Sequence, residues 1–100
     1  MSLMENLKMK QEKAIDNKVV EFAEEMESII IQSAEKGYGS FRYTINNENP
    51  DKHLMRSQKF AEKLEMLMDG VKVRYEVQKK KYVLLASTYN EYSLLFDWTD

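Results

Sequence analysis

The chain has 100 residues, of which 43% are hydrophobic, and its 15 basic and 17 acidic side chains give a formal net charge of −2 at pH 7. This length and apolar content predict one domain, residues 1–100, with a single hydrophobic core, and exclude a wholly disordered chain. No cysteine is present and no apolar run approaches the roughly 20 residues that cross a bilayer, so we expect a cytoplasmic protein without disulfides or a membrane partner.

Residues 5–36 have the periodicity of an amphipathic helix that ends at Lys36-Gly37. The stripe steps by three and four along Ile15, Val19, Phe22, Met26, Ile29 and Ser33. Upstream, the same spacing continues in the weaker residues Met4, Leu7, Gln11 and Ala14. Met4 is also a candidate start of the natural chain, which would make residues 1–3 an added leader.

An unbroken helix over this region would be about 48 Å long, whereas a compact domain of this size has a radius of gyration of about 13 Å. Either the helix breaks near Asp16, which could cap a new helix, or residues 1–14 project as a helical arm. A projecting arm with a thin apolar stripe invites a partner helix. Met4, Leu7, Gln11 and Ala14 are therefore candidate partner-binding residues.

A strand and a second helix follow. The stretch "SFRYTIN" alternates, with Phe41 and Tyr43 on one face and Arg42 on the other. Asn49-Pro50 then predicts a helix start, because proline at the first helical position loses no needed N–H group. An amphipathic stripe runs from Leu54 to Met68, and Asp69-Gly70 ends the helix.

Three strands are predicted in the remaining sequence. "VKVRYEV" alternates, and Lys79, Lys80 and Lys81 follow where a hairpin would turn. "YVLLAST", residues 82–88, is apolar on both faces, as expected of a central strand. Asn90-Glu91 is predicted as a second tight connection before the closing strand "YSLLFDW".

The predicted order is thus α-β-α-β-β-β in an α+β fold. We expect two helices packed on one face of a roughly four-stranded, mostly antiparallel sheet, with an N-terminal helical extension.

Three stretches together carry a resemblance: "SAEKGYGSFRYTI", "KLEMLMDGVKVRYEV" and "LLFDW". Over roughly residues 20–98 the chain resembles small accessory proteins of phages and prophages, which commonly combine helix, strand, helix and a closing strand with tryptophan. The extra strand at residues 82–88 departs from that shorter pattern. The resemblance implies a small intracellular protein that contacts other macromolecules, and it carries over no catalytic residue.

Basic side chains suggest an alternative, contact with nucleic-acid phosphates. The candidates are Arg42, Lys72, Arg74, Lys79, Lys80 and Lys81. Tyr43 and Tyr75 have the opposite parity to Arg42, Lys72 and Arg74, so they would not offer bases a stacking platform on the same face. A solvated hairpin tip, with lysines that prevent pairing between sheet edges, is the interpretation we favour.

Catalytic and metal signatures are weak. His53 is the only histidine and has no helical neighbour carboxylate at the right spacing, and Glu21 and Glu25 lie on a helix face directed to solvent. The sequence has no phosphate-binding loop or catalytic triad pattern. We therefore expect neither an enzyme nor a cofactor.

The sequence predicts a non-enzymatic protein–protein interaction or regulatory module. It would associate with itself, as a homodimer or other homo-oligomer, through the N-terminal helix or the sheet, and with an unidentified protein. Tyr89 and Tyr92, near predicted turns, join the candidate partner-binding residues because tyrosine is favoured at interfaces.

Overall fold

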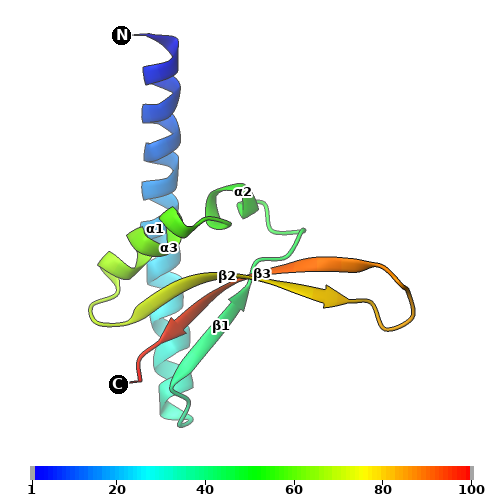
Figure 1. Ribbon diagram of the computed structural model, residues 1–100. Helices are drawn as coiled ribbons and strands as arrows, with labels where there is room; N and C mark the ends of the chain where they lie inside the picture. The colour runs from blue at the N-terminus through cyan, green and yellow to red at the C-terminus, as the bar shows by residue number, and fades with distance from the viewer. Residues whose placement is uncertain (1, 100) are drawn as a thin grey trace.

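The computed structural model describes residues 2–99, which form three helices and one antiparallel three-stranded sheet (Figure 1). The elements are α1 (Leu3–Glu35), β1 (Ser40–Thr44), α2 (Lys52–Met55), α3 (Gln58–Leu67), β2 (Lys72–Lys81) and β3 (Thr88–Asp97). The α+β class is confirmed, but the sheet has three strands where four were predicted.

Helix α1 is continuous over 33 residues, so of the two alternatives that the sequence left open, a break near Asp16 or a projecting arm, the break does not occur. Ser2 caps its start, because the Ser2 hydroxyl accepts a hydrogen bond from the Glu5 amide at 3.2 Å. The first turns extend away from the rest of the molecule (Figure 1). The Cα radius of gyration is accordingly 15.8 Å, larger than the about 13 Å typical of a compact domain of this size.

The second helical region is broken in two, whereas the sequence predicted one helix. Helix α2 ends at Met55 and α3 begins at Gln58, because Ser57 has an extended backbone and its hydroxyl accepts a hydrogen bond from the Phe60 amide at 3.1 Å. This N-cap starts a new helix in a new direction.

In the sheet, β3 lies between β1 and β2 and pairs antiparallel with both. Phe96 is opposite Phe41 on one side and Val73 on the other, while Leu95 is opposite Arg42 and Arg74. Residues 82–88 were predicted as a central strand. In the structure residues 82–87 are the loop of the β2–β3 hairpin, and Thr88 begins β3.

The hydrophobic core lies between the two longer helices and one face of the sheet. It is built around Phe22, whose ring meets Tyr43 edge-on at a centroid distance of 4.9 Å and lies 6.0 Å from Phe60 and 6.3 Å from Phe96. The fully buried members from helices and sheet include Phe22, Met26, Phe60, Leu64, Leu94 and Phe96. As predicted, both helices cover the same face of the sheet.

The β2–β3 hairpin continues well past the end of β1. Strand β1 ends at Thr44, opposite Ser93, whereas β2 and β3 remain paired as far as Lys81 and Thr88. The outer half of the hairpin is therefore a two-stranded ribbon that projects from the molecule (Figure 1). Isolated two-stranded ribbons have little stability of their own in water.

Candidate interaction surfaces

The first candidate surface is the arm, residues 3–14, which precedes Ile15, the first buried residue of α1. The exposed fractions of its large apolar side chains are 72% for Leu3, 66% for Met4, 57% for Leu7 and 56% for Met9. The predicted partner-binding residues Gln11 and Ala14 are also exposed. The spacing of Met4, Leu7 and Gln11 continues into Ile15, so the arm's stripe extends the same helix face that packs on the sheet.

Ion pairs hold α1 against α3 at the base of the arm. Glu12 accepts hydrogen bonds from the ammonium groups of Lys59, at 2.6 Å, and Lys63, at 2.7 Å, and Lys63 also pairs with Asp16. These two lysines lower the pKa of Glu12 to about 2, chiefly by hydrogen bonding. The same network raises the pKa of Lys63, with Asp16 as the largest cause. The network ties the base of the arm to α3.

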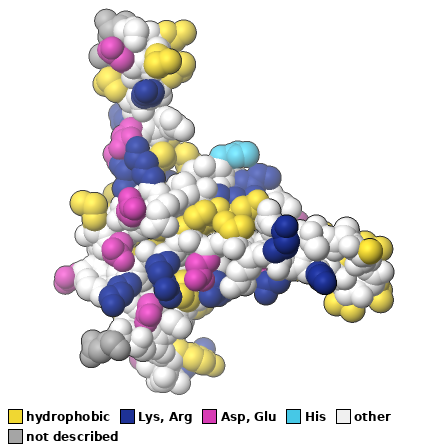
Figure 2. All heavy atoms as spheres, in the orientation of Figure 1, with side chains coloured by type: hydrophobic (Ala, Val, Ile, Leu, Met, Phe, Trp, Pro, Cys, Tyr) yellow, Lys and Arg dark blue, Asp and Glu magenta, His cyan; other side chains and the backbone are white. Residues whose placement is uncertain are grey.

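The second candidate surface is the hairpin tip, residues 82–87. Val83 is 98% exposed, Leu84 93% and Leu85 64%. The Tyr82 amide donates a weak hydrogen bond to the Ser87 carbonyl at 3.3 Å, and the rings of Tyr82 and Tyr89 lie 4.7 Å apart at the base of the loop. Figure 2 shows hydrophobic side chains at the far ends of both projections, the arm and the hairpin.

The structure corrects two predicted positions near the tip. Lys79, Lys80 and Lys81 do not form the turn; they lie in β2, opposite Asn90, Tyr89 and Thr88. Asn90 and Glu91 likewise lie within β3 and do not form a tight connection. The lysines thus border an apolar tip, which is the reverse of the predicted solvated basic tip.

The two tyrosines proposed for partner binding differ in their surroundings. Tyr89 is 40% exposed and contacts Tyr82. Tyr92 is half-buried, and the Arg56 guanidinium lies 4.0 Å from the centre of its ring. Only Tyr89 is close to the hairpin tip.

The six proposed nucleic-acid residues fall into two groups. Arg42, Lys72 and Arg74 lie on the sheet face away from the helices, as predicted, where Arg42 pairs with Glu76 at 2.7 Å and donates to the Ser93 hydroxyl at 2.8 Å. Asp97, opposite Lys72, has a pKa lowered mainly by hydrogen bonds from Thr99, with smaller contributions from Arg74 and Lys72. Acidic neighbours therefore offset part of the positive charge of this group.

The second basic group, Lys79, Lys80 and Lys81, lies in the outer half of the hairpin, beyond the end of β1. Lys80 shares a sheet face with Arg74, and Lys79 and Lys81 lie on the opposite face. The six residues are therefore not gathered into one basic patch.

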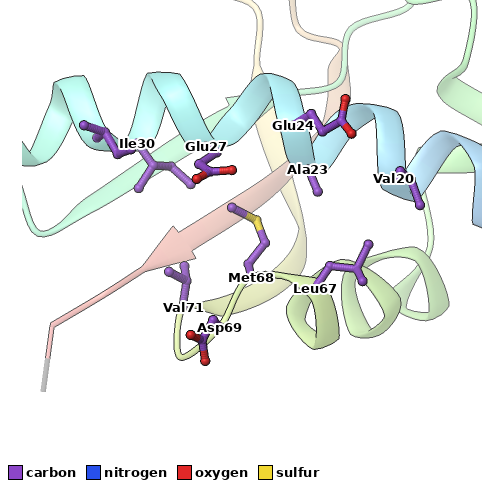
Figure 3. Close-up of a pocket in the computed structure, with 10 residues that line it drawn as sticks. Val20, Ala23, Glu24, Glu27, Ile30, Leu67, Met68, Asp69 and Val71 are labelled. Carbon is purple, nitrogen blue, oxygen red and sulfur yellow. The ribbon is translucent and has the colours of Figure 1, made fainter.

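A groove between α1 and the α3–β2 turn is the third surface, and the sequence analysis did not identify it (Figure 3). It has a volume of about 440 Å³, and its lining is mainly apolar. The apolar residues that line it are Val20, Ala23, Ile30, Ile31, Leu67, Met68 and Val71. In Figure 3 the Met68 side chain reaches from the turn toward α1, with Val20 and Leu67 toward one end of the groove and Ile30 and Val71 toward the other.

All charged residues that line the groove are acidic: Glu24, Glu27 and Asp69. A shallower polar hollow along α1 adjoins the groove, shares Glu24 and Glu27 with it, and adds Glu35. Val20 and Ile31 could have indicated the groove, because they are apolar residues of α1 outside its main apolar stripe. Each is 50% exposed in the structure.

The candidate catalytic residues do not form a site in the described part of the chain. His53 is exposed, as are Glu21 and Glu25. Within residues 2–99, no group of three or more His, Asp or Glu side chains is placed to hold a metal ion. No helix among these residues is both long enough and apolar enough to cross a membrane.

No protein-family model matches this chain, and neither a curated protein nor a solved structure matches it.

Proposed function

We propose that this chain is a non-enzymatic interaction module of the cytoplasm that associates with itself through its N-terminal arm. The observation that carries the proposal is the exposure of Met4 and Leu7 on one face of a helix that projects from the core. Soluble monomers rarely keep a row of large apolar side chains on a projecting element, and such surfaces commonly mark interaction sites.

The physical basis of the proposal is that the apolar stripe of α1 is buried along one part of the helix and uncovered along another. From Ile15 onward the stripe packs on the sheet and α3, whereas before Ile15 no element covers it. Residues 3–14 contribute no side chain to the core, and α3 holds the arm through ion pairs to Glu12, so the turns before Glu12 gain little from tertiary packing. A second arm against Met4, Leu7 and Ala14 would bury the stripe and stabilise both helices.

The polar residue in the stripe fits this proposal. Gln11 occupies a position equivalent to a core site in a two-helix interface, where one polar side chain sets the register at some cost in stability. We therefore propose a homodimer in which the two arms pair with each other. In the alternative arrangement, the arm pairs with a helix of a host protein. The resemblance to phage and prophage accessory proteins is consistent with either.

The test is the mass of the full chain in solution. Light scattering and sedimentation over a concentration series should show a dimer that dissociates on dilution, and a chain beginning at residue 12 should remain monomeric at the same concentrations. This truncation keeps Glu12, Ile15 and the core. A full-length chain that is monomeric throughout, and that captures no helical partner through the arm, would contradict the proposal.

Nucleic-acid binding has one supporting observation, the closeness of Lys79, Lys80 and Lys81 on the projecting ribbon. Phosphate contacts by these lysines would weaken steeply with salt. Titration against generic DNA and RNA at about 50 mM salt, where such contacts are strong, distinguishes this alternative from the proposed function.

A further inference from the structure

We infer that the hairpin tip of one copy docks in the α1/α3 groove of a second copy. The inference rests on the proposed self-association but uses a different pair of surfaces from the arm. Its starting point is that both surfaces are apolar and exposed to solvent within the isolated chain. They differ in shape, since the tip projects and the groove is hollow.

The sizes are compatible. The tip presents three aliphatic side chains in sequence, Val83, Leu84 and Leu85. The groove has a volume of about 440 Å³, about three times that of a cavity which holds one benzene molecule, about 150 Å³. Two or three aliphatic side chains can therefore be accommodated between α1 and the α3–β2 turn.

The charges are complementary. Lys79, Lys80 and Lys81 border the tip, and all of the charged side chains lining the groove are acidic, Glu24, Glu27 and Asp69. Insertion of the apolar tip would bring the lysines to the groove's rim. Opposite charges around an apolar contact favour one orientation over others and accelerate association.

The contact has to be intermolecular. The groove includes Val71, which immediately precedes β2, whereas the tip follows Lys81 at the other end of that strand. Ten residues of extended strand separate the two surfaces by about 30 Å, so a tip cannot reach the groove of its own chain. Because the two surfaces differ, copies either exchange tips reciprocally in a closed pair or form a longer assembly.

The tip and the groove are tested by separate substitutions in the full chain. Leu84→Asp places a charge on a side chain that is 93% exposed, and Ile31→Lys places one in the groove at a position that is 50% exposed. Each should weaken self-association by about 30-fold or more, as expected for a central interface residue. Met66→Asp is the matched control, because Met66 is 84% exposed and does not line the groove.

Mixing in the Leu7→Glu background, where the arm contact is removed, provides the decisive measurement. The Leu84→Asp copy retains an intact groove, and the Ile31→Lys copy retains an intact tip, so the mixture should associate more strongly than either variant does alone. Charge reversal gives a second check. The tip variant carries Lys79→Glu and Lys81→Glu, and the groove variant carries Glu24→Lys and Glu27→Lys. Each variant alone should associate more weakly, and a mixture of the two should regain association.

All variants are measured by sedimentation velocity in both the wild-type and Leu7→Glu chains, so that the arm contact is separated from the tip contact. If Leu7→Glu abolishes association while Leu84→Asp and Ile31→Lys leave it unchanged, the inference is overturned and the arm proposal stands. If the reverse holds, the inference stands and the arm proposal fails. A lipid surface is the competing partner of the tip, and it is tested with phosphatidylserine–phosphatidylcholine vesicles. The inference is overturned if the chain binds these vesicles, Leu84→Asp abolishes that binding, and the mixed variants do not associate.

Discussion

Leu7→Glu is the substitution that most directly tests the arm. Leu7 is 57% exposed, and full burial of a leucine side chain contributes about 1.5–3 kcal/mol. Scaling that range by the exposed fraction gives about 0.9–1.7 kcal/mol for each copy, or about 2–3 kcal/mol for a symmetric pair. The dimer's dissociation constant should therefore rise by about 30- to 150-fold.

Met9→Glu is the matched control. Met9 is 56% exposed, but it lies two residues further along the helix, about 200° around its axis at 3.6 residues per turn. Glutamate, leucine and methionine have similar helix propensities, so neither change should disrupt the arm itself. Met9→Glu should leave the dissociation constant nearly unchanged.

The assay is sedimentation velocity from about 1 μM to 1 mM, the range in which a weak dimer would dissociate. Urea denaturation of the monomers should give unfolding free energies within about 0.5 kcal/mol of the wild type for both variants, because both side chains lie on the surface. Equal effects of the two substitutions on self-association would refute a contact confined to the Met4–Leu7 face.

Three further predictions concern stability. Phe22→Ala should lower the unfolding free energy by about 3–5 kcal/mol, because Phe22 is 1% exposed. Met66→Ala, the control, should change it by about 0.5 kcal/mol or less, and urea denaturation measures both. The folded-state pKa of Glu12 is about 2, below its ordinary value of 4.5, so its stabilising contribution is complete above pH 4.5 and disappears as the pH falls towards 2. Glu12→Gln should therefore lose less stability than the wild type over that interval, and parallel urea midpoints would contradict this. Gly70 has a φ of 88°, so Gly70→Ala should lower the free energy of unfolding by about 1–2 kcal/mol in thermal or urea unfolding. Gly70→Asn should lower it less, and an equal loss in both variants would show that the backbone conformation is not the cause.

Helix α1 and strand β1 were predictable from the sequence, because the spacing of their apolar residues matches the faces that are buried in the structure. The stripe from Ile15 to Ile29 lies towards the core, and the alternation around Tyr43 matches the sheet's two faces. The break between α2 and α3 was missed because the amphipathic stripe continues across it. Ser57 was the available signal, since serine three residues before Phe60 can cap a new helix.

The hairpin was predicted incorrectly for a different reason. Loops were assigned from polar and turn-forming residues, and residues 82–87 contain neither glycine nor proline, whereas Asn90 does resemble a turn residue. The register overrides this local preference, because β3 pairs with β2 through Asn90 and Lys79. An apolar loop is consistent with a tip whose role lies in a contact outside its own chain.

The candidate site was only partly accessible from the sequence. The arm could be predicted from the length of the helix and the spacing of Met4 and Leu7. The groove could not, because it depends on how Leu67 and Val71 approach α1 after the chain has folded. The pairing of Arg42 with Glu76 likewise depends on the register of strands that are distant in the sequence.

The strand order has a consequence for synthesis of the chain. Because β3 lies between β1 and β2, neither outer strand has its sheet partner until the residues up to Asp97 have left the ribosome exit tunnel. Until then, α1 and α3 are the elements already synthesised that can cover Phe41 and Val73. Ribosome stalling before β3 emerges should consequently yield protease-sensitive chains, and release should restore resistance in a single step.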